Sequence, residues 1–319
     1  MSATAKAQPN IALVKYWGKR DVARNLPAVN SLSITLDSLH TTMAVEFDDN
    51  READELRING ASAEGLLQRV SKCLDLVAGA GRPKARVDST SNFPIGAGLA
   101  SSASAFAALV VAADGVCRAG LPQADLARLA GETSGSAARS LFGGFVELRA
   151  GDEQIEVGQL LDAAEWPLEV IVAVTATGPK PVGSGEAMIR GAGTSPFYSS
   201  WIERQGEDME VAREAVLNRE FELLAKVSEH NCMKMHSIMW TSRPAIVYWN
   251  AATLTCLEAI RDLQAAGHGV FFTIDAGPQV KAVCLPESAV AVEATLSGIS
   301  GVDRTMRSGL GAGARLIDA

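Results

Sequence analysis

The chain has 319 residues, of which 47% are hydrophobic and 21% are charged, and its formal net charge is −8. This length fits two globular domains better than one, because a single hydrophobic core stops growing at about 250–300 residues. The acidic balance and the lack of a basic tail argue against nucleic acid or an anionic membrane as the main partner, although local basic residues can still bind anions.

The first predicted strand carries cations at its end. Residues 1–9 are polar and lack the apolar core of a signal peptide. Residues 11–14 form an apolar run that predicts a strand, followed directly by Lys15-Tyr16-Trp17-Gly18-Lys19-Arg20-Asp21. Lysines at a rigid strand end can neutralise phosphate or carboxylate groups. A solvated loop whose aromatic rings cover the edge of the core explains the same residues, so both interpretations stay open.

The next predicted elements lead to a glycine-rich segment. Residues 41–47 alternate as in a half-buried strand, and the apolar residues of 65–77 share one helical face. An alanine-rich run predicts a helix over 101–117, in which the apolar stretch 105–113 is too short to span a bilayer. The segment that leads into this helix, together with its first two residues, contains Asn92, Gly96, Ala97, Gly98, Leu99, Ala100, Ser101 and Ser102.

This segment is typical of a loop that holds phosphate. Gly96 and Gly98 can adopt backbone angles that bring amides close to a ligand, and the start of a helix attracts anions. The loop is not a Walker A motif, because no G-K-[ST] follows. It is not the dinucleotide-binding fingerprint either, because Ser101 stands where that motif has its third glycine. The alternative is a plain connection between a strand and a helix.

A second segment of small residues follows a predicted helix over 123–132. It contains Ser134, Ser136 and Arg139 and ends in a Gly143-Gly144 pair before a predicted strand over 145–148. Small residues let a ligand approach the backbone, and an arginine can bind an oxyanion through two parallel hydrogen bonds. A helix start followed by a glycine turn into the strand is the alternative.

The second half of the chain mixes strands and helices without strict alternation. Strands are predicted over 170–174, 270–274 and 280–285, and helices over 207–235, in one or two pieces, and over 252–266. The composition shifts in a glycine- and proline-rich stretch at 177–185. The sequence therefore predicts an α+β architecture with an N-terminal domain over 1–178 and a C-terminal domain over 179–319.

Asp275 is the candidate proton acceptor. It stands where an apolar strand ends and a tight turn begins, and partial burial there would perturb its pKa. Aspartates also start turns for purely local reasons, which is the alternative. The five scattered cysteines contain no C-x-x-C pair, and His230, Cys232 and His236 do not share one helical face, so reduced thiols in a cytosolic protein are favoured over a disulfide framework or a zinc site.

Together and in this order, these segments resemble the GHMP kinase superfamily and, within it, the mevalonate diphosphate decarboxylase family. The resemblance spans nearly the whole chain, and its most specific motifs are K-Y-W-G-K-R-D and D-A-G-P. The matching motifs are NIALVKYWGKRD (10–21), NSLSITL (30–36), NFP-x-x-AGLASS (92–102), SGSA-x-RSL-x-GG (134–144), MH (235–236), P-x-I-x-Y (244–248) and DAGP (275–278).

The resemblance implies a fold and a reaction. The N-terminal half should resemble ribosomal protein S5 domain 2, and the C-terminal half should be ferredoxin-like. The implied reaction uses ATP and Mg²⁺ to phosphorylate the tertiary hydroxyl of mevalonate 5-diphosphate. The new phosphate then leaves as the carboxylate departs as carbon dioxide, which gives isopentenyl diphosphate. Members of this family are commonly cytoplasmic homodimers, and we expect the same here.

The resemblance also implies roles for individual residues. Asp275 should orient or deprotonate the hydroxyl, Lys15 should keep Asp275 ionised or stabilise developing charge, and Arg139 should hold the substrate carboxylate. The substrate should contact Ser134 and Ser136, and its diphosphate should contact Tyr16, Trp17 and Lys19. The phosphates of ATP should contact Ser101, Ser102 and the backbone amides of Gly96, Ala97, Gly98, Leu99 and Ala100. Magnesium should bind Ser102, and the nucleotide should approach Ser89 and Asn92.

One segment departs from the family pattern. Many bacterial members carry Ser-Arg-x-Gly-Met after the interdomain strand, and the arginine reaches the substrate diphosphate. Here the residues are Ser184-Gly185-Glu186-Ala187-Met188, with Lys180 and Arg190 as candidate substitutes. The missing arginine leaves open a related decarboxylase acting on mevalonate 5-phosphate. Two further alternatives are a mevalonate 3-kinase or another small-molecule kinase, against which Asp275, Lys15 and Arg139 together argue, and a catalytically silent ATP-binding protein.

Overall fold

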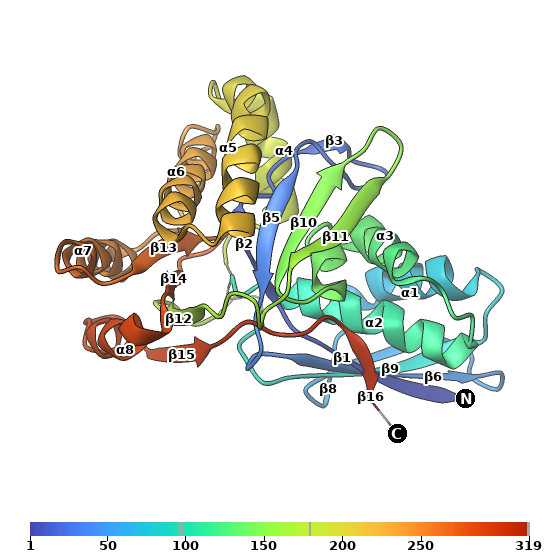
Figure 1. The fold of residues 1–319 in the computed structure, drawn as a ribbon. Helices are drawn as coiled ribbons and strands as arrows, with labels where there is room; N and C mark the ends of the chain where they lie inside the picture. The colour runs from blue at the N-terminus through green and yellow to red at the C-terminus, as the bar shows by residue number, and fades with distance from the viewer. Residues whose placement is uncertain (96–97, 179, 318–319) are drawn as a thin grey trace.

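The structure is a computed structural model that describes residues 1–95, 98–178 and 180–317 (Figure 1). It combines antiparallel and mixed sheets with helices packed against them, which confirms the predicted α+β class. None of the helices within these ranges is long and apolar enough to cross a membrane.

The first sheet forms the outer wall of the N-terminal half. Its strands, in spatial order, are β16 (Arg315–Ile317), β1 (Ser2–Ala7), β6 (Thr41–Asp48), β9 (Lys84–Ser91), β7 (Glu55–Ile58) and β8 (Ala61–Ser62). The polar N-terminal residues thus form a strand that the sequence analysis missed. Only alternate side chains of β1 face the core, and these are alanines, which give a weak hydrophobic pattern.

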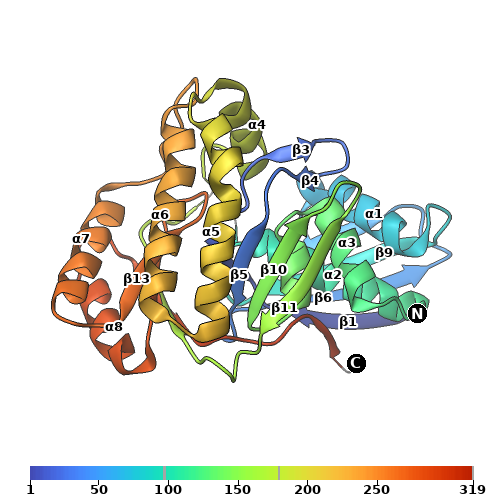
Figure 2. The same ribbon diagram turned by 45° about the horizontal axis from the view of Figure 1, so that its top comes forward.

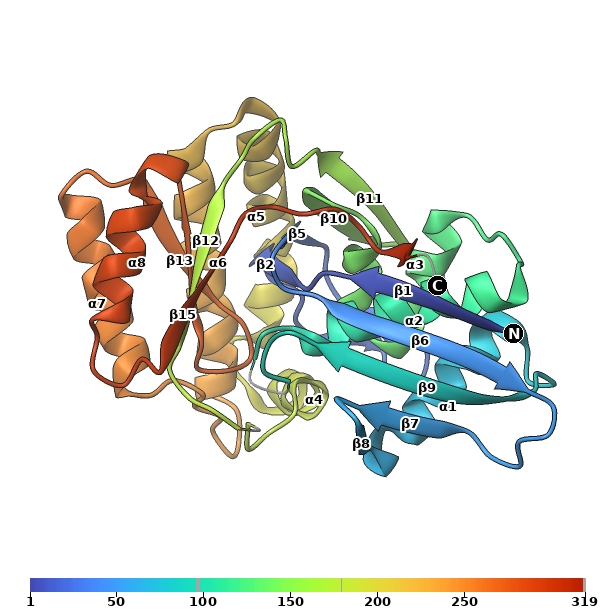
Figure 3. The ribbon, with the colours of Figure 1, turned by 90° about the horizontal axis from the view of Figure 1, so that it is seen from below.

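Helix α2 (Ser101–Cys117) is buried along most of its length, and its bounds match the prediction. Its alanines let it approach β1 and β6 closely, and Figure 3 shows it behind these strands. Helices α1 (Glu64–Ala78) and α3 (Gln123–Thr133) flank it, and a short 3-10 helix over Ala137–Leu141 covers its other side. The N-terminus of α2 is therefore held firmly at the centre of the molecule.

The second sheet lies in the middle of the molecule. Its spatial order is β11 (Ile155–Leu161), β10 (Phe145–Ala150), β5 (Ser31–Thr35) and β2 (Asn10–Val14). The long helices α5 (Tyr198–Asn218) and α6 (Phe221–Trp240) run side by side next to it (Figure 2). They separate at Arg219, whose left-handed backbone (φ 59°) ends α5, so the predicted helical stretch is two helices.

The third sheet belongs to the C-terminal half. Its spatial order is β13 (Val270–Ile274), β14 (Val280–Cys284), β12 (Glu169–Val174) and β15 (Arg304–Ser308), with every neighbouring pair antiparallel. Helices α6, α7 (Ala251–Ala265) and α8 (Ala289–Ser297) pack against it. The domain boundary at 178/179 stays a prediction; β12, which precedes it, pairs in this sheet, and β16 returns to β1.

Two further elements border the space between the halves. The hairpin of β3 (Lys19–Asp21) and β4 (Leu26–Pro27) follows the predicted cationic strand end. Helix α4 (Ser184–Thr194) occupies the segment that departs from the family pattern. A core cluster that includes Leu13, Val170, Leu224 and Phe271 joins the second and third sheets through α5 and α6. The two halves are therefore packed on a shared core, with a cavity at their junction.

Candidate active site

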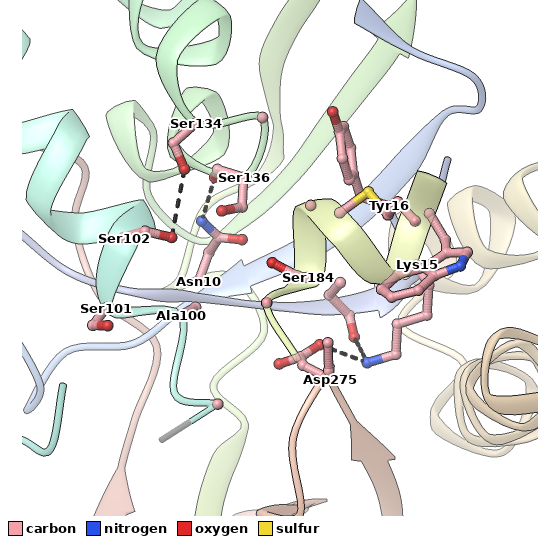
Figure 4. A pocket seen from close by; sticks show the side chains of 18 of the residues that line it. Asn10, Lys15, Tyr16, Ala100, Ser101, Ser102, Ser134, Ser136, Ser184 and Asp275 are labelled. Carbon is pink, nitrogen blue, oxygen red and sulfur yellow. Dashed lines mark hydrogen bonds and ion pairs between the residues drawn. The ribbon is translucent and has the colours of Figure 1, made fainter. Parts of the chain in front are cut away.

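A cavity of about 520 Å³ lies at this junction. Its described lining includes one carboxylate, Asp275, and five cationic side chains, Lys15, Lys19, Arg69, Arg139 and Lys180. Lys15 and Asp275 directly follow β2 and β13, Lys19 lies in β3, Arg69 in α1, Arg139 in the 3-10 helix and Lys180 in the interdomain segment. The site therefore forms only when both halves pack together. Figure 4 shows Asp275, Lys15, Tyr16 and several serines around this space.

Asp275 is held between two buried lysines. Its Oδ1 lies 2.8 Å from Lys15 Nζ, and its Oδ2 lies 3.2 Å from Lys281 Nζ. Both lysine side chains are 1% exposed, whereas the Asp275 side chain is 23% exposed toward the cavity. The Lys15 ammonium also donates to the carbonyl of Ala12, 2.8 Å away. The carboxylate is thus fixed from behind, and it can still reach a ligand.

The two ammonium groups control the ionisation of Asp275. Burial alone would raise the pKa of this carboxyl, but the charges of Lys15 and Lys281 outweigh burial and hold its pKa well below the usual range. Burial lowers the pKa of Lys180 to about 8, against the opposing charge of Asp275, and the Lys180 ammonium donates to the carbonyl of Ala276 at 2.7 Å. At neutral pH the site therefore presents an ionised Asp275.

Arg139 is buried and fixed in one orientation. Its side chain is 2% exposed, and its guanidinium donates to the neutral oxygens of Asn10 (3.1 and 3.2 Å) and Ser31 (2.7 Å). Asn10 is itself anchored, since its amide donates to Ser140 Oγ and to the carbonyl of Ser136. Burial lowers the pKa of Arg139 to about 10, which still leaves it charged at neutral pH. A charge held by neutral partners at the cavity wall favours an anionic ligand.

The wall next to Arg139 is aromatic and cationic. The Tyr16 ring lies 5.9 Å from the Arg139 guanidinium, and burial raises the pKa of its hydroxyl to about 12. That hydroxyl is buried and has no hydrogen-bond partner among the described residues. Burial and the nearby Arg69 charge both lower the pKa of Lys19. Two cations that repel each other across a cavity wall favour an anion between them.

The glycine turn before α2 has the geometry of a tight approach. Gly98 has φ 83°, and a Cβ on it would lie 3.1 Å from Gly277 Cα in the turn after Asp275. Ala100, directly before the helix, has φ 52°, which costs about 1–2 kcal/mol for a residue with a Cβ. Leu99 points into the shared core and anchors the turn. Strain held by surrounding structure at a cavity is typical of a binding loop.

Hydroxyl groups line the wall between the turn and Arg139. Ser101, Ser102, Ser134 and Ser136 all border the cavity, and Ser134 Oγ lies 3.5 Å from Ser102 Oγ. Among the described residues there is no cluster of three metal-ligating His, Cys, Asp or Glu side chains. Magnesium normally keeps several waters and binds through substrate phosphates with few protein ligands. The donor set therefore fits a magnesium ion carried in by a nucleotide.

Most of the predicted site residues border the cavity, but some do not. Ser89 lies within β9, and Asn92 accepts from the amide of His40 and donates to the carbonyl of Ser38, which braces a turn. Arg190 pairs with Glu186 outside the lining, so of the two candidate substitutes only Lys180 reaches the cavity. Gly96 and Ala97, which were expected to contact ATP, lie outside the described residues.

Two residues of the site were missed by the sequence analysis: Arg69, which lines the cavity, and Lys281, which lies behind Asp275 and pairs with it. Arg69 lies within α1, and its side chain donates to the carbonyl of Thr133. Lys281 interrupts the otherwise apolar strand β14, six residues after Asp275. A single lysine in a fully buried strand almost always has a paired charge, so this signal was present in the sequence.

The fold and this lining define a protein of the small-molecule kinase type, built to bind a phosphorylated ligand. Two family models match the chain, the diphosphomevalonate decarboxylase-like N-terminal domain over residues 7–158 and the mevalonate 5-diphosphate decarboxylase C-terminal domain over residues 170–306. The chain belongs to the mevalonate diphosphate decarboxylase family, which has the GHMP kinase fold. The predicted family and fold class are thereby confirmed.

Individual relatives match this chain over 80% or more of their own length. The diphosphomevalonate decarboxylase of Aspergillus fumigatus is 35% identical over 94% of this chain and 80% of its own. The mevalonate diphosphate decarboxylase structure from Staphylococcus aureus is 34% identical, with a TM-score of 0.93 over 99% of this chain and 98% of its own. A structure of MDDEF in complex with MVAPP, AMPPCP and magnesium has the same identity and TM-score over 100% of this chain and 99% of its own.

Proposed function

We propose that this chain catalyses the ATP-dependent decarboxylation of mevalonate 5-diphosphate to isopentenyl diphosphate, with release of ADP, phosphate and carbon dioxide. The observation that carries the proposal is the lining of the cavity, in which five cations surround one ionised carboxylate. The substrate and ATP together bring a carboxylate and several phosphates, which need this excess of positive charge. The related complex with MVAPP, AMPPCP and magnesium supports the same pairing of ligands.

Asp275 acts on the tertiary hydroxyl. A tertiary alcohol is a weak nucleophile, so its oxygen must be oriented toward the γ-phosphate of ATP and its proton must be accepted. The ionised Asp275 can accept a hydrogen bond from that hydroxyl. Its low pKa makes it a better orienting group than proton store, because a weak base holds the transferred proton poorly. Lys15 keeps Asp275 ionised and stabilises charge that develops beside it.

Arg139 binds the substrate carboxylate. Its guanidinium is already oriented by Asn10 and Ser31, so little freedom is lost when the ligand arrives. Ser134 and Ser136 complete this wall. Once the hydroxyl carries phosphate, departure of that phosphate leaves the tertiary carbon electron-poor. The carbon–carbon bond to the carboxylate then supplies the electron pair of the new double bond, and carbon dioxide leaves.

The phosphates occupy the two ends of the cavity. Ser101, Ser102 and the backbone around Gly98 hold the phosphates of ATP at the N-terminus of α2. Tyr16, Trp17 and Lys19 hold the substrate diphosphate at the other end. Magnesium, when it is bound with ATP near Ser102, neutralises phosphate charge during transfer.

One observation favours a second candidate, decarboxylation of mevalonate 5-phosphate. Position 185 borders the cavity as glycine, and a Cβ there would meet no atom within 4 Å. The space that an arginine would fill toward a distal phosphate is therefore open. Lys180 and Lys19 supply positive charge elsewhere on the lining.

Turnover on the two substrates decides between these candidates. We expect carbon dioxide release with mevalonate 5-diphosphate to exceed release with mevalonate 5-phosphate at equal concentration. A clear preference for the monophosphate would overturn the first proposal in favour of the second. ADP formation without carbon dioxide would identify a kinase that stops after phosphorylation, and the absence of both products would identify a silent ATP-binding protein. A cytoplasmic location and a homodimer remain parts of the proposal.

A further inference from the structure

We propose that Lys281 is a positioning residue that connects the glycine turn before α2 to Asp275, so that the seating of the nucleotide and the orientation of the reacting hydroxyl depend on one ammonium group. This inference rests on the proposed function. It assigns a role to a residue that the predicted site did not include.

The geometry of Lys281 is that of a bridge between the two halves. It lies on β14 in the C-terminal sheet, and its Nζ donates to the carbonyl of Gly98 at 2.8 Å. The same Nζ lies 3.2 Å from Asp275 Oδ2. With a side chain only 1% exposed, Lys281 has no competing contact with bulk water. One cation therefore touches both the turn expected to hold ATP and the carboxylate expected to hold the hydroxyl.

The backbone on each side of this bridge is already close-packed. A Cβ on Gly98 would lie 3.1 Å from Gly277 Cα, so the turn before α2 rests on the turn after Asp275. The amide of Gly277 donates to the carbonyl of Asp275 at 2.8 Å, which fixes that second turn. A shift of the Gly98 carbonyl on nucleotide binding would therefore move the Lys281 ammonium relative to Asp275.

Lys281 is one of several charged or titratable groups around Asp275. They come from different elements: Lys15 from the end of β2, Lys281 from β14, Lys180 from the interdomain segment, Arg139 from the 3-10 helix, and Cys232 and His236 from α6. Of these, Lys15 and Lys281 make the direct ion pairs with the carboxylate. Lys281 alone of this pair also contacts the turn of Gly98.

Two variants separate the charge of Lys281 from its hydrogen bond. Lys281→Met removes both, whereas Lys281→Gln removes the charge and keeps a hydrogen-bond donor at the end of the side chain. Lys84→Met, at an exposed lysine on β9, is the matched control. The readouts are the affinity for AMPPCP by calorimetry, which needs no turnover, and the pH profile of kcat/KM from carbon dioxide release. Urea unfolding of each variant checks that it is folded.

The expected results differ between the variants. Lys281→Met should weaken AMPPCP binding about tenfold, and Lys281→Gln should weaken it less, because glutamine still carries a donor for the Gly98 carbonyl. Both should move the acid limb of the pH profile to higher pH, because loss of a neighbouring cation raises the pKa of Asp275 and a protonated Asp275 no longer offers a charged oxygen to orient the hydroxyl. A residue with only a structural role would lower activity equally at every pH.

Wild-type AMPPCP affinity together with an unmoved acid limb in both variants would overturn the inference. If Lys281→Met does not fold, Lys281→Gln still tests the charge through the acid limb. Failure of the proposed function is a separate result, since wild-type protein would then release no carbon dioxide or would release it preferentially from mevalonate 5-phosphate. In that case a wild-type AMPPCP affinity in Lys281→Gln with a loss in Lys281→Met would still support the bridge to Gly98, and equal affinities would refute it.

Discussion

Replacing Asp275 by asparagine tests both the chemistry and the electrostatics of the site. The substitution keeps the size of the side chain and removes its charge. It leaves Lys15 and Lys281 buried on either side of a neutral amide, since each ammonium has lost a carboxylate oxygen at 2.8 or 3.2 Å. The prediction therefore has one consequence for turnover and another for stability.

The magnitudes follow from these distances. At an effective dielectric constant of about 20, attractions over 2.8 and 3.2 Å amount to about 6 and about 5 kcal/mol before the cost of desolvation. Removing one partner of a buried pair lowers the free energy of unfolding by about 3–5 kcal/mol, because the remaining charge stays buried. Loss of a group that accepts or orients a proton lowers kcat by about 10²–10⁴-fold. ATP binding should persist.

The pH dependence of the loss in stability has a definite sign. In Asp275→Asn the pKa of at least one buried lysine falls below its unfolded value, because burial and the second ammonium both disfavour its charge. The unfolded state then binds more protons than the folded state between these two pKa values. The free energy of unfolding of the variant should therefore rise as the pH increases through that interval. In the wild type, Asp275 has a lowered pKa, so the stability that it contributes is lost only as the pH falls toward acid.

Urea unfolding at pH 7 and pH 9, with carbon dioxide release and AMPPCP binding, measures these effects. We expect the variant to have a lowered free energy of unfolding at pH 7 that partly recovers at pH 9. It should still bind AMPPCP, and its turnover should be low. Unchanged turnover would remove Asp275 from the mechanism. Unchanged unfolding at both pH values would show that Lys15 and Lys281 do not depend on its charge.

Three further substitutions test other parts of the site. Arg139→Lys keeps the charge but loses the planar guanidinium held by Asn10. Steady-state kinetics should show that kcat/KM falls about 10²-fold, with a larger fall in kcat/KM for the substrate than in kcat/KM for ATP. Gly98→Ala places a Cβ 3.1 Å from Gly277 Cα at φ 83°, so AMPPCP affinity measured by calorimetry should fall, and normal affinity would contradict the close approach. His236→Phe removes the donor to the carbonyl before Asp275, 3.2 Å away, which should lower the free energy of unfolding in urea by about 1–3 kcal/mol and reduce kcat.

Much of the central structure could be predicted because local sequence signals agree with it. The apolar run that predicts a helix over 101–117 became α2 with the same bounds. The apolar run that ends at Ile274 became β13, with Asp275 directly after it. In both cases the hydrophobic pattern and the residues that end it indicate the same element, so tertiary packing had little to override.

Other parts could not be predicted because they depend on long-range pairing. Strand β1 carries alternating alanines and small polar residues, and it is defined by pairing with β6 and β16 from distant parts of the chain. The role of Lys281 depends on Gly98, 183 positions away in the sequence. The local sequence pattern predicts only that Arg69 lies in a helix. Its position at the cavity depends on how α1 packs against the rest of the fold.

The excess positive charge of the cavity explains why the site needs the whole fold. Lys15 reaches Asp275 from the second sheet, and Lys281 reaches it from the third, so neither half alone balances the carboxylate with both cations. The shared core that holds these sheets together must also offset the repulsion among five cations around one carboxylate. Ligand phosphates and a ligand carboxylate relieve that repulsion only when they bind the folded protein, which stabilises the packed arrangement by mass action. The charges that make the empty cavity unfavourable are therefore the same charges that select a highly anionic pair of substrates.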